Sequence, residues 1–293
     1  MLIEFWSQVF GRLGKNPRQT RCVDIASGTG SVLQCAEEHL SNETTLLCGL
    51  DSSTQAIQQL KHRLPNVVGI VADASSIPIE SQSVDLVTSQ FGVEYAGFEG
   101  ILEAARVVRE GGALVFLLHC RPGAIYSECS SSVEVIDRLQ QARFFPLARA
   151  MFKAGFAFFQ GGERYPYERA AHKFRSSFRL LDRLLSKYGQ GVASGFVLRL
   201  RDDVARISQR LQHHDRKEVF EWIERLNDEM LSYRLRMKSM AGAAVDRKTL
   251  ERIQRELSEL GFSSTEAKAL SPQDGAGQLA WSLEAHRTSA NLA

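Results

Sequence analysis

A glycine-rich turn near the start of the chain constrains the fold more than any other feature. The apolar, β-prone run Val23–Ala26 leads into the turn Ser27–Gly30, and a helical pattern begins directly after it. A second apolar run, Leu46–Leu50, ends in Asp51. In α/β proteins, a nucleoside site is typically built from a strand, a glycine turn, a helix, and a second strand that ends in an acid, in this order. The order therefore predicts a ligand site at the carboxyl ends of the first two strands.

Strand and helix patterns alternate from about residue 21 to residue 120. Continuous apolar runs separated by helices are typical of a parallel sheet covered on both faces, so we expect an α/β fold with a doubly wound sheet. The strands are expected at Arg21–Ala26, Leu46–Leu50, Val67–Ala72, Ser83–Ser89 and Ala113–His119. The helices are expected at Ser31–His39, Ser53–Leu64 and Gly100–Arg109, the last ending at a glycine stop formed by Gly111 and Gly112.

The character of the chain changes after this region and then changes back. From about residue 125 to residue 245 the pattern is helical. Residues 121–245 carry 22 lysines and arginines against 14 acids, whereas the rest of the chain carries 14 against 20. This split predicts a helical insert at 121–245 within an α/β domain made of 1–120 and 246–293. At the end, Asp246–Leu260 is expected to be helical, and Phe262–Leu270 with Gln278–Ala285 to form a hairpin that gives the sheet an antiparallel edge.

Composition narrows the class of protein. The net charge of +2 gives no argument for a nucleic-acid or membrane partner. The five cysteines are scattered without a CxxC pair, which favours buried thiols in a reducing compartment over disulfides or a metal site. The first residues show no basic segment followed by an apolar run, and no run has the length needed to span a bilayer. We therefore expect a cytoplasmic protein with no membrane partner.

Five stretches, in matching order and spacing, resemble the class I S-adenosylmethionine-dependent methyltransferases, in the subgroup that includes quinone-biosynthesis and other small-molecule enzymes. They are Val23–Gly30, Gly49–Asp51, Ala72–Pro78, Ser83–Gly92 and Ala104–Gly112. The insert carries no such resemblance. The resemblance implies an enzyme with a mostly parallel, Rossmann-like sheet of seven strands, one of them antiparallel. It also implies S-adenosylmethionine as the cofactor.

The resemblance assigns roles around that cofactor. Gly28 and Gly30 would pass beneath its methionine and ribose, Asp51 would bind the ribose hydroxyls, and Asp73 would accept a hydrogen bond from the adenine amino group. The full set of implied cofactor-binding residues is Asp24, Ala26, Ser27, Gly28, Gly30, Asp51, Ser52, Asp73, Ala74, Gln90 and Phe91. The usual first glycine of the turn is Ala26 here, and we expect its methyl group to shift the loop only slightly.

A dinucleotide is a weaker fit to the same turn. Its fingerprint needs a third glycine three residues after the second, for close packing of helix on strand. That position is Leu33 in this chain. A nicotinamide or flavin cofactor is therefore not expected.

His119 is the leading candidate for a general base. It ends the expected fifth strand, at the edge of the sheet where ligands bind, and imidazole accepts a proton near neutral pH. The alternative is a histidine that orders the adjoining loop. Glu94 and Tyr95 follow the fourth strand and could contact the acceptor or the cofactor, or Phe91 and Tyr95 could simply wall the pocket. No metal site is expected, because adjacent His213 and His214 would point in different directions on a helix.

Three further features each allow a functional and a structural interpretation. Phe5 and Trp6 could form a lid over a sulfonium, or could pack in the core. The aromatic run Met151–Phe159 could line an acceptor pocket, form the insert's own core, or make a dimer surface. Arg175, Arg179 and Arg183 recur every four residues, as expected of a solvated helical ridge or, alternatively, of a surface that contacts an anion.

The leading functional hypothesis is methyl transfer to an oxygen or nitrogen of a small-molecule acceptor held under a helical cap. One rival is an enzyme that uses the basic insert to hold RNA or an acidic carrier protein. Against nucleic acid, the fourth strand leads into Ser89–Gly92 rather than an [DN]-P-P-[YFW] motif. A second rival is a cofactor-binding scaffold without catalysis. The insert could also support a homodimer.

Overall fold

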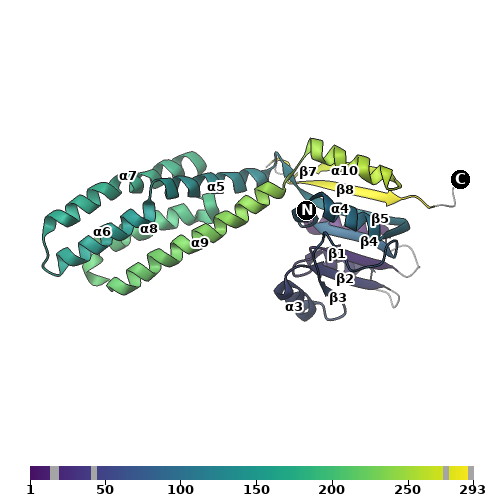
Figure 1. Ribbon diagram of the computed structural model, residues 1–293, viewed down its shortest axis with the longest axis horizontal. Helices are drawn as coiled ribbons and strands as arrows, with labels where there is room; N and C mark the ends of the chain where they lie inside the picture. Colours follow the sequence, from purple (N-terminus) through teal and green to yellow (C-terminus); the bar gives the residue numbers. More distant parts are fainter. Residues whose placement is uncertain (14–19, 41–44, 273–276, 290–293) are drawn as a thin grey trace. The chain divides into compact units, whose positions relative to one another are not determined.

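The chain divides into two compact units. The computed structural model describes residues 1–13, 20–40, 45–272 and 277–289. One unit, the α/β unit, comprises Met1–Tyr126 and Ala243–Ala293, and the other, the helical unit, comprises Ser127–Gly242 (Figure 1). Residues 273–276, between the two strands of the expected hairpin, lie outside the described residues.

The α/β unit is built on a sheet with the strand order β3-β2-β1-β4-β5-β8-β7. Its strands are β1 (Arg21–Ile25), β2 (Leu46–Asp51), β3 (Val68–Val71), β4 (Val84–Gln90), β5 (Val108–Arg121), β7 (Phe262–Leu270) and β8 (Ala280–Arg287), with the short β6 (Val245–Asp246) paired to the end of β5. Strands β1 to β5 run parallel, and β8 is antiparallel to both β5 and β7. The doubly wound, mostly parallel α/β fold is therefore confirmed.

The hairpin differs from the expectation in one respect. Strand β8 lies between β5 and β7, so the antiparallel strand is internal and the edge strand β7 runs in the direction of β5. The reason is that each step of the hairpin reverses the chain direction, and the second strand in sequence is the one that pairs with β5.

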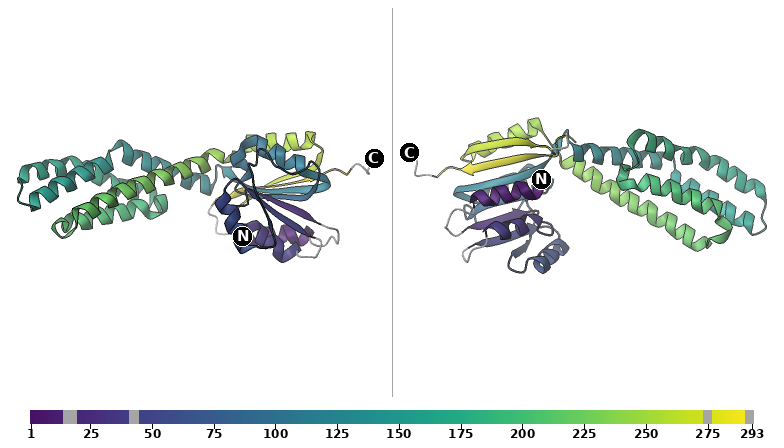
Figure 2. Two further views of the ribbon diagram at one scale, coloured as in Figure 1. Left: turned by 60° about the horizontal axis from the view of Figure 1, so that its bottom comes forward. Right: turned by 180° about the vertical axis from the view of Figure 1, so that it is seen from behind.

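Helices cover both faces of the sheet, as Figure 2 shows. Helices α1 (Leu2–Leu13), α2 (Ser31–Leu40) and α3 (Thr54–Arg63) pack on one face. Helices α4 (Gly97–Val107) and α10 (Arg247–Glu259) pack on the other. Successive residues of β5 enter opposite cores: Leu114 and Phe116 face α4 and α10, whereas Val115 and Leu117 face α1 to α3. Burial on both faces explains why the strands are continuously apolar.

The prediction that α4 ends at Gly111 and Gly112 is wrong. The helix ends at Val107, and Gly111 and Gly112 lie within β5. The strand's register with β4 shifts between Val84 and Leu86, opposite these glycines. Gly111 has a φ of +70°, and a Cβ at Gly112 would lie 2.8 Å from the Asp85 carbonyl oxygen. The two glycines therefore permit a close, irregular approach of β5 to β4.

The helical unit has its own hydrophobic core. The helices of this unit are α5 (Ala124–Gln141), α6 (Phe144–Phe159), α7 (Arg164–Tyr188), α8 (Phe196–Gln209) and α9 (Arg216–Ala243), with the 3-10 turns η2 (Val192–Gly195) and η3 (Leu211–His213). In the aromatic run, Met151, Phe152 and Phe156 are buried in this core, whereas Phe159 is 45% exposed. The arginine ridge of α7 is exposed. Within the described residues, no helix combines the length and apolar character that crossing a membrane requires.

Candidate active site

Three residues in the turn between β1 and α2 have left-handed backbone conformations, and their surroundings differ. Ala26, Gly28 and Gly30 have φ values of +52°, +53° and +86°. A Cβ on Gly30 would overlap the Leu60 side chain of α3, whereas a Cβ on Gly28 would meet nothing within 4 Å among the described residues. The resemblance assigns both glycines to the close approach of a ligand. A side chain at position 30 is instead excluded by packing within the chain, whereas position 28 faces open space.

The Ala26 methyl group is accommodated by a second glycine. A side chain at Gly92, which follows β4, would collide with Ala26 Cβ. Ala26 adopts the left-handed conformation itself, which costs a non-glycine residue about 1 kcal/mol or more. The left-handed Ala26 therefore strains the backbone, and its methyl group fits because residue 92 has no side chain; the slight shift of the loop stays a prediction.

Asp51 connects three segments at the carboxyl end of β2. Its Oδ2 accepts a hydrogen bond from the Gly28 N–H at 2.9 Å, and its Oδ1 accepts from the Ser53 N–H at 2.8 Å. Ser53 in turn caps α3 by accepting from the Ala56 N–H. The Asp51 carbonyl accepts from the Ala72 N–H at 3.1 Å, which ties in the residue after β3. The carboxylate is thus held in place by the backbone of the turn and of α3.

A cleft of about 160 Å³ opens beside this carboxylate. It is lined by Ala26, Leu50, Asp51, Ser52, Ala72, Asp73, Ala74, Gly92, Tyr95 and Ala96. Ligand sites typically measure about 300–1,000 Å³, so this cleft would enclose only part of a cofactor-sized molecule. Larger hollows, of about 440 and 550 Å³ in the helical unit and 620 Å³ between α1 and the β7–β8 hairpin, are lined by none of the predicted cofactor residues.

The acceptor and donor groups around the turn suit a nucleoside. Asp73 Oδ1 accepts from both the N–H and the Oγ of Ser75, and these bonds hold the pKa of Asp73 below its usual value. Ser27 is buried, and its Oγ has no hydrogen-bond partner among the described residues. Carboxylates of this kind are natural acceptors for sugar hydroxyls and for an amino group.

Asp24 lies beneath the turn rather than in the cleft. It is only 1% exposed, and its Oδ1 accepts from the Thr88 hydroxyl of β4 at 2.8 Å. Burial raises the pKa of Asp24 to about 7; the Thr88 hydrogen bond opposes this shift, and the Asp51 charge adds to it. Thr88 was missed in the sequence analysis, although a polar residue in the middle of the apolar β4 is the signal that could have pointed to it.

Gln90 is held by the N-terminal helix. Trp6 Nε1–H donates to Gln90 Oε1 at 2.7 Å, and the Trp6 ring is 2% exposed and stacked with Phe10. Trp6 therefore belongs to the core, and of the two interpretations offered for it, packing is the one observed. The next residue, Phe91, has a φ of +55° and turns the chain out of β4.

His119 and Glu94 form a buried pair. Glu94 Oε1 accepts from the His119 backbone N–H at 2.9 Å and from His119 Nδ1 at 2.7 Å. An ionised carboxylate can only accept, so beside an ionised Glu94 the Nδ1 atom carries the proton, and in the neutral imidazole Nε2 then keeps its lone pair. The imidazole packs against Phe91, at 4.6 Å between ring centroids, and against Tyr95, at 5.9 Å. Tyr95 lines the cleft, so one ring separates the histidine from it.

Comparison with known proteins decides the family. Residues 23–116 match the family model described as a methyltransferase domain. Residues 23–116, within the α/β unit, are a methyltransferase domain, and the resemblance to the class I S-adenosylmethionine-dependent methyltransferases is confirmed. The match includes the turn, Asp51, Asp73 and Gln90, and it ends before His119 and the helical unit.

The chain is similar in sequence to proteins that are named as methyltransferases. The chain is 34% identical over 105 residues to the ubiquinone/menaquinone biosynthesis C-methyltransferase UbiE of Campylobacter jejuni, covering 34% of this chain and 45% of that protein. It is 32% identical over 123 residues to a demethylmenaquinone methyltransferase of Thermotoga maritima, covering 38% and 51%. The chain thus spans about half the length of these relatives.

Among solved structures, an S-adenosylmethionine-dependent methyltransferase from Aquifex aeolicus shares 16% identity with a TM-score of 0.35, over 41% of this chain and 64% of that one. The cofactor of the family is S-adenosylmethionine. The residues of this cleft fit it: two carboxylates line the cleft, and in the described part of the chain nothing fills the space at Gly28 and no group hydrogen-bonds the Ser27 hydroxyl of the turn.

Proposed function

We propose that the chain transfers the methyl group of S-adenosylmethionine to an oxygen or nitrogen of a small-molecule acceptor. The observation that carries the proposal is the Asp51 carboxylate, held by the Gly28 and Ser53 N–H groups beside a cleft that Asp73 and Ala74 also line. Its remaining lone pairs can accept the two ribose hydroxyls. Ser52 and Ala26 would complete the cradle, with Asp73 taking the adenine amino group and the Ala74 N–H the ring.

The bound cofactor supplies an activated methyl group on a sulfonium, and the chain must orient the acceptor and remove its proton. Asp51, Asp73 and the Gly28 turn would hold this cofactor, which would supply its methyl group to a lone pair of the acceptor, with the electrons of the broken bond left on sulfur. His119 Nε2 is the proposed acceptor of that proton, with an ionised Glu94 fixing the other proton on Nδ1. Because His119 is buried and is not among the residues that line the cleft, this step requires the Tyr95 ring beside it to move aside. Glu94 Oε2 is buried without a hydrogen-bond partner in the described part of the chain, and it would stabilise the imidazolium so formed.

Cofactor binding is tested with Asp51→Ala and a matched control. Two hydrogen bonds to a charged acceptor are worth about 1.5 kcal/mol or more each, so affinity for S-adenosylmethionine should fall about 100-fold or more by calorimetry. Asp85→Ala is the control. Its carboxylate also accepts a backbone N–H, from Arg21, and an arginine, Arg109, but it lies near the start of β4, at the opposite edge of the sheet. Wild-type affinity in a folded Asp51→Ala protein would refute the ribose assignment.

The proton-transfer role is tested with His119→Ala. Turnover should fall about 100-fold, the usual effect of removing a general base, while affinity for S-adenosylmethionine changes little. Glu94→Gln should lower turnover by less, because the charged partner of the imidazole is lost while an oxygen that can accept from Nδ1 is kept. Unchanged turnover of His119→Ala at saturating acceptor would remove the histidine from the reaction.

A carbon acceptor is the second candidate function. The relatives whose names specify a carbon position are the quinone-biosynthesis C-methyltransferases. Carbon methylation of a hydroquinone-type ring needs the same proton removal from a ring hydroxyl. Turnover with ¹³C-methyl-labelled cofactor against a panel of phenols, amines and hydroquinones distinguishes the candidates, because the chemical shift of the product methyl reports whether oxygen, nitrogen or carbon received it.

The helical unit is proposed to select the acceptor. It has its own core and lies wholly outside the methyltransferase match. Hydrogen exchange should therefore slow in α5 to α9 when the acceptor found in the panel is added, and should not respond to S-adenosylmethionine alone. Light scattering tests the alternative role, assembly of a homodimer.

A further inference from the structure

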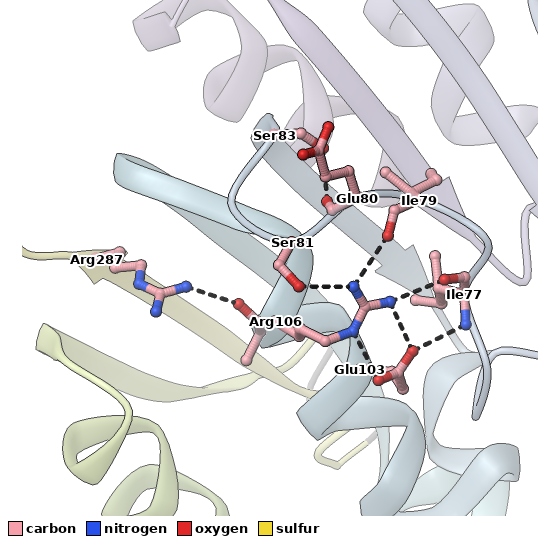
Figure 3. Close-up of polar contacts among 9 residues, drawn as sticks. Ile77, Ile79, Glu80, Ser81, Ser83, Glu103, Arg106 and Arg287 are labelled. Carbon is pink, nitrogen blue, oxygen red and sulfur yellow. Dashed lines mark hydrogen bonds and ion pairs between the residues drawn. The ribbon is translucent and has the colours of Figure 1, made fainter.

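An arginine outside the cleft uses every donor it has. Arg106 lies on α4, and all five N–H groups of its guanidinium donate (Figure 3). Nε and one Nη2 hydrogen reach the two oxygens of Glu103, at 2.8 and 2.9 Å. The others reach the carbonyls of Ile77 and Ile79 and the hydroxyl of Ser81, at 2.8, 2.9 and 3.0 Å. Such complete use of the planar group gives geometric specificity that a lysine cannot reproduce.

The bonds of Arg106 converge on the irregular segment that joins β3 to β4. Glu103 Oε2 also accepts from the Ile77 N–H at 2.9 Å, so both backbone groups of Ile77 are held by this one ion pair. Farther along, the Gln82 N–H donates to the Arg106 carbonyl at 3.0 Å. Residues 77–82 are therefore fastened to α4 rather than to the sheet.

Ile77 ends the turn that forms one wall of the cleft. The turn begins at Ala72, whose N–H donates to the Asp51 carbonyl, and it continues through Asp73, which accepts from Ser75 and Ser76. Asp51 thus holds the first end of the turn, and the Glu103–Arg106 pair holds the second. Tyr95 and Ala96, which also line the cleft, belong to the 3-10 turn η1 (Val93–Ala96) that leads directly into α4. The same helix therefore adjoins both of these parts of the cleft lining.

Simple stabilisation does not account for the pair. The Arg106 and Glu103 side chains are 34% and 24% exposed, and ion pairs open to solvent contribute little to folding. The hydrogen bonds from Arg106 lower the pKa of Glu103, so the carboxylate is ionised and able to accept throughout the neutral range. What the pair supplies is a fixed position for Ile77, four residues after Asp73.

We propose that Arg106, oriented by Glu103, is a positioning residue that fixes the adenine-facing wall Ala72–Ala74 and so sets the affinity for the adenosyl part of the cofactor. This inference rests on the proposed function. It assigns to a pair that touches no ligand the task of keeping Asp73 at the distance at which it meets the adenine amino group.

The test compares Arg106→Lys with Arg109→Lys. Arg109 is the matched control because its Nε also donates to a carboxylate, that of Asp85, but its bonds lie away from the cleft-forming turn. Arg106→Lys should weaken S-adenosylmethionine binding by about tenfold, because a lysine cannot keep all the hydrogen bonds that fix Ile77 and its neighbours. It should weaken 5′-methylthioadenosine, which lacks the amino-acid part, by the same factor, and hydrogen exchange should quicken in residues 73–83. Glu103→Gln should give a smaller loss of the same kind.

The outcomes separate this inference from the proposed function. If wild-type protein binds no S-adenosylmethionine, the proposed function fails. If wild-type protein binds it and Arg106→Lys binds it equally well, or loses no more affinity than Arg109→Lys, the positioning role is refuted while the function stands. If Arg106→Lys is not folded, Glu103→Gln decides between the same two results.

Discussion

Asp24 should make the stability of the protein fall as the pH rises from about 4 to about 7. The carboxyl group is fully buried, and burial raises its pKa from 3.8 to about 7. The unfolded chain therefore releases this proton near pH 4, whereas the folded chain keeps it until about pH 7. Between these values the folded state binds more protons, so each pH unit costs about 1.4 kcal/mol of stability. Above pH 7 the full cost is about 4 kcal/mol.

The perturbation that reveals this cost is Asp24→Asn. The amide keeps an oxygen that can accept the Thr88 hydroxyl but has no proton to lose. The variant should gain stability relative to wild type as the pH rises, and the gain should grow by about 3 kcal/mol between pH 5 and pH 8. Urea unfolding of both proteins across this range measures it, and groups that titrate in both proteins cancel in the difference.

A second variant checks the cause. Thr88 donates to the charged form and lowers the pKa of Asp24, so Thr88→Val should move the pH-dependent region upward. The reasoning is refuted if the difference in unfolding free energy between Asp24→Asn and wild type stays constant from pH 5 to pH 8. It is also refuted if Thr88→Val shifts the transition to lower pH.

Three other predictions follow from the contacts around the cleft. Gly30→Ala should destabilise the fold by several kcal/mol, because its Cβ would overlap Leu60 at a positive φ, whereas Gly28→Ala should cost only about 1 kcal/mol and mainly weaken S-adenosylmethionine binding; thermal melts with calorimetry compare them. Burial raises the pKa of Cys48 to about 11, so iodoacetamide at pH 8 should leave this thiol unmodified in the folded protein by mass spectrometry, and ready labelling there would contradict the described burial. Ser53→Ala removes the cap of α3 and should lower the free energy of unfolding by about 1 kcal/mol. Urea unfolding measures this loss, and an unchanged midpoint would contradict the capping role.

Much of the fold was predictable because its signals are local. The strands of the α/β unit are runs of apolar residues, the helices between them have amphipathic spacing, and Ser53 and Asp246 cap helices as their types favour. The glycine turn and the acid that ends β2 could be placed at one edge of the sheet because parallel strands present their carboxyl ends together. The end of α4 was misplaced, since a glycine pair stops a helix and bends a strand equally well.

The amino-acid sequence by itself determined the parallel sheet, the place of the ligand turn and the identity of the acid beside it, because each depends on residues close together in the chain. Only the tertiary structure decided that Leu60 requires Gly30, that Trp6 holds Gln90, that Glu94 holds His119 and that Arg106 fastens Ile77. These contacts join residues 25 to 84 positions apart, or depend on how two segments pack, and local periodicity carries no information about such pairings.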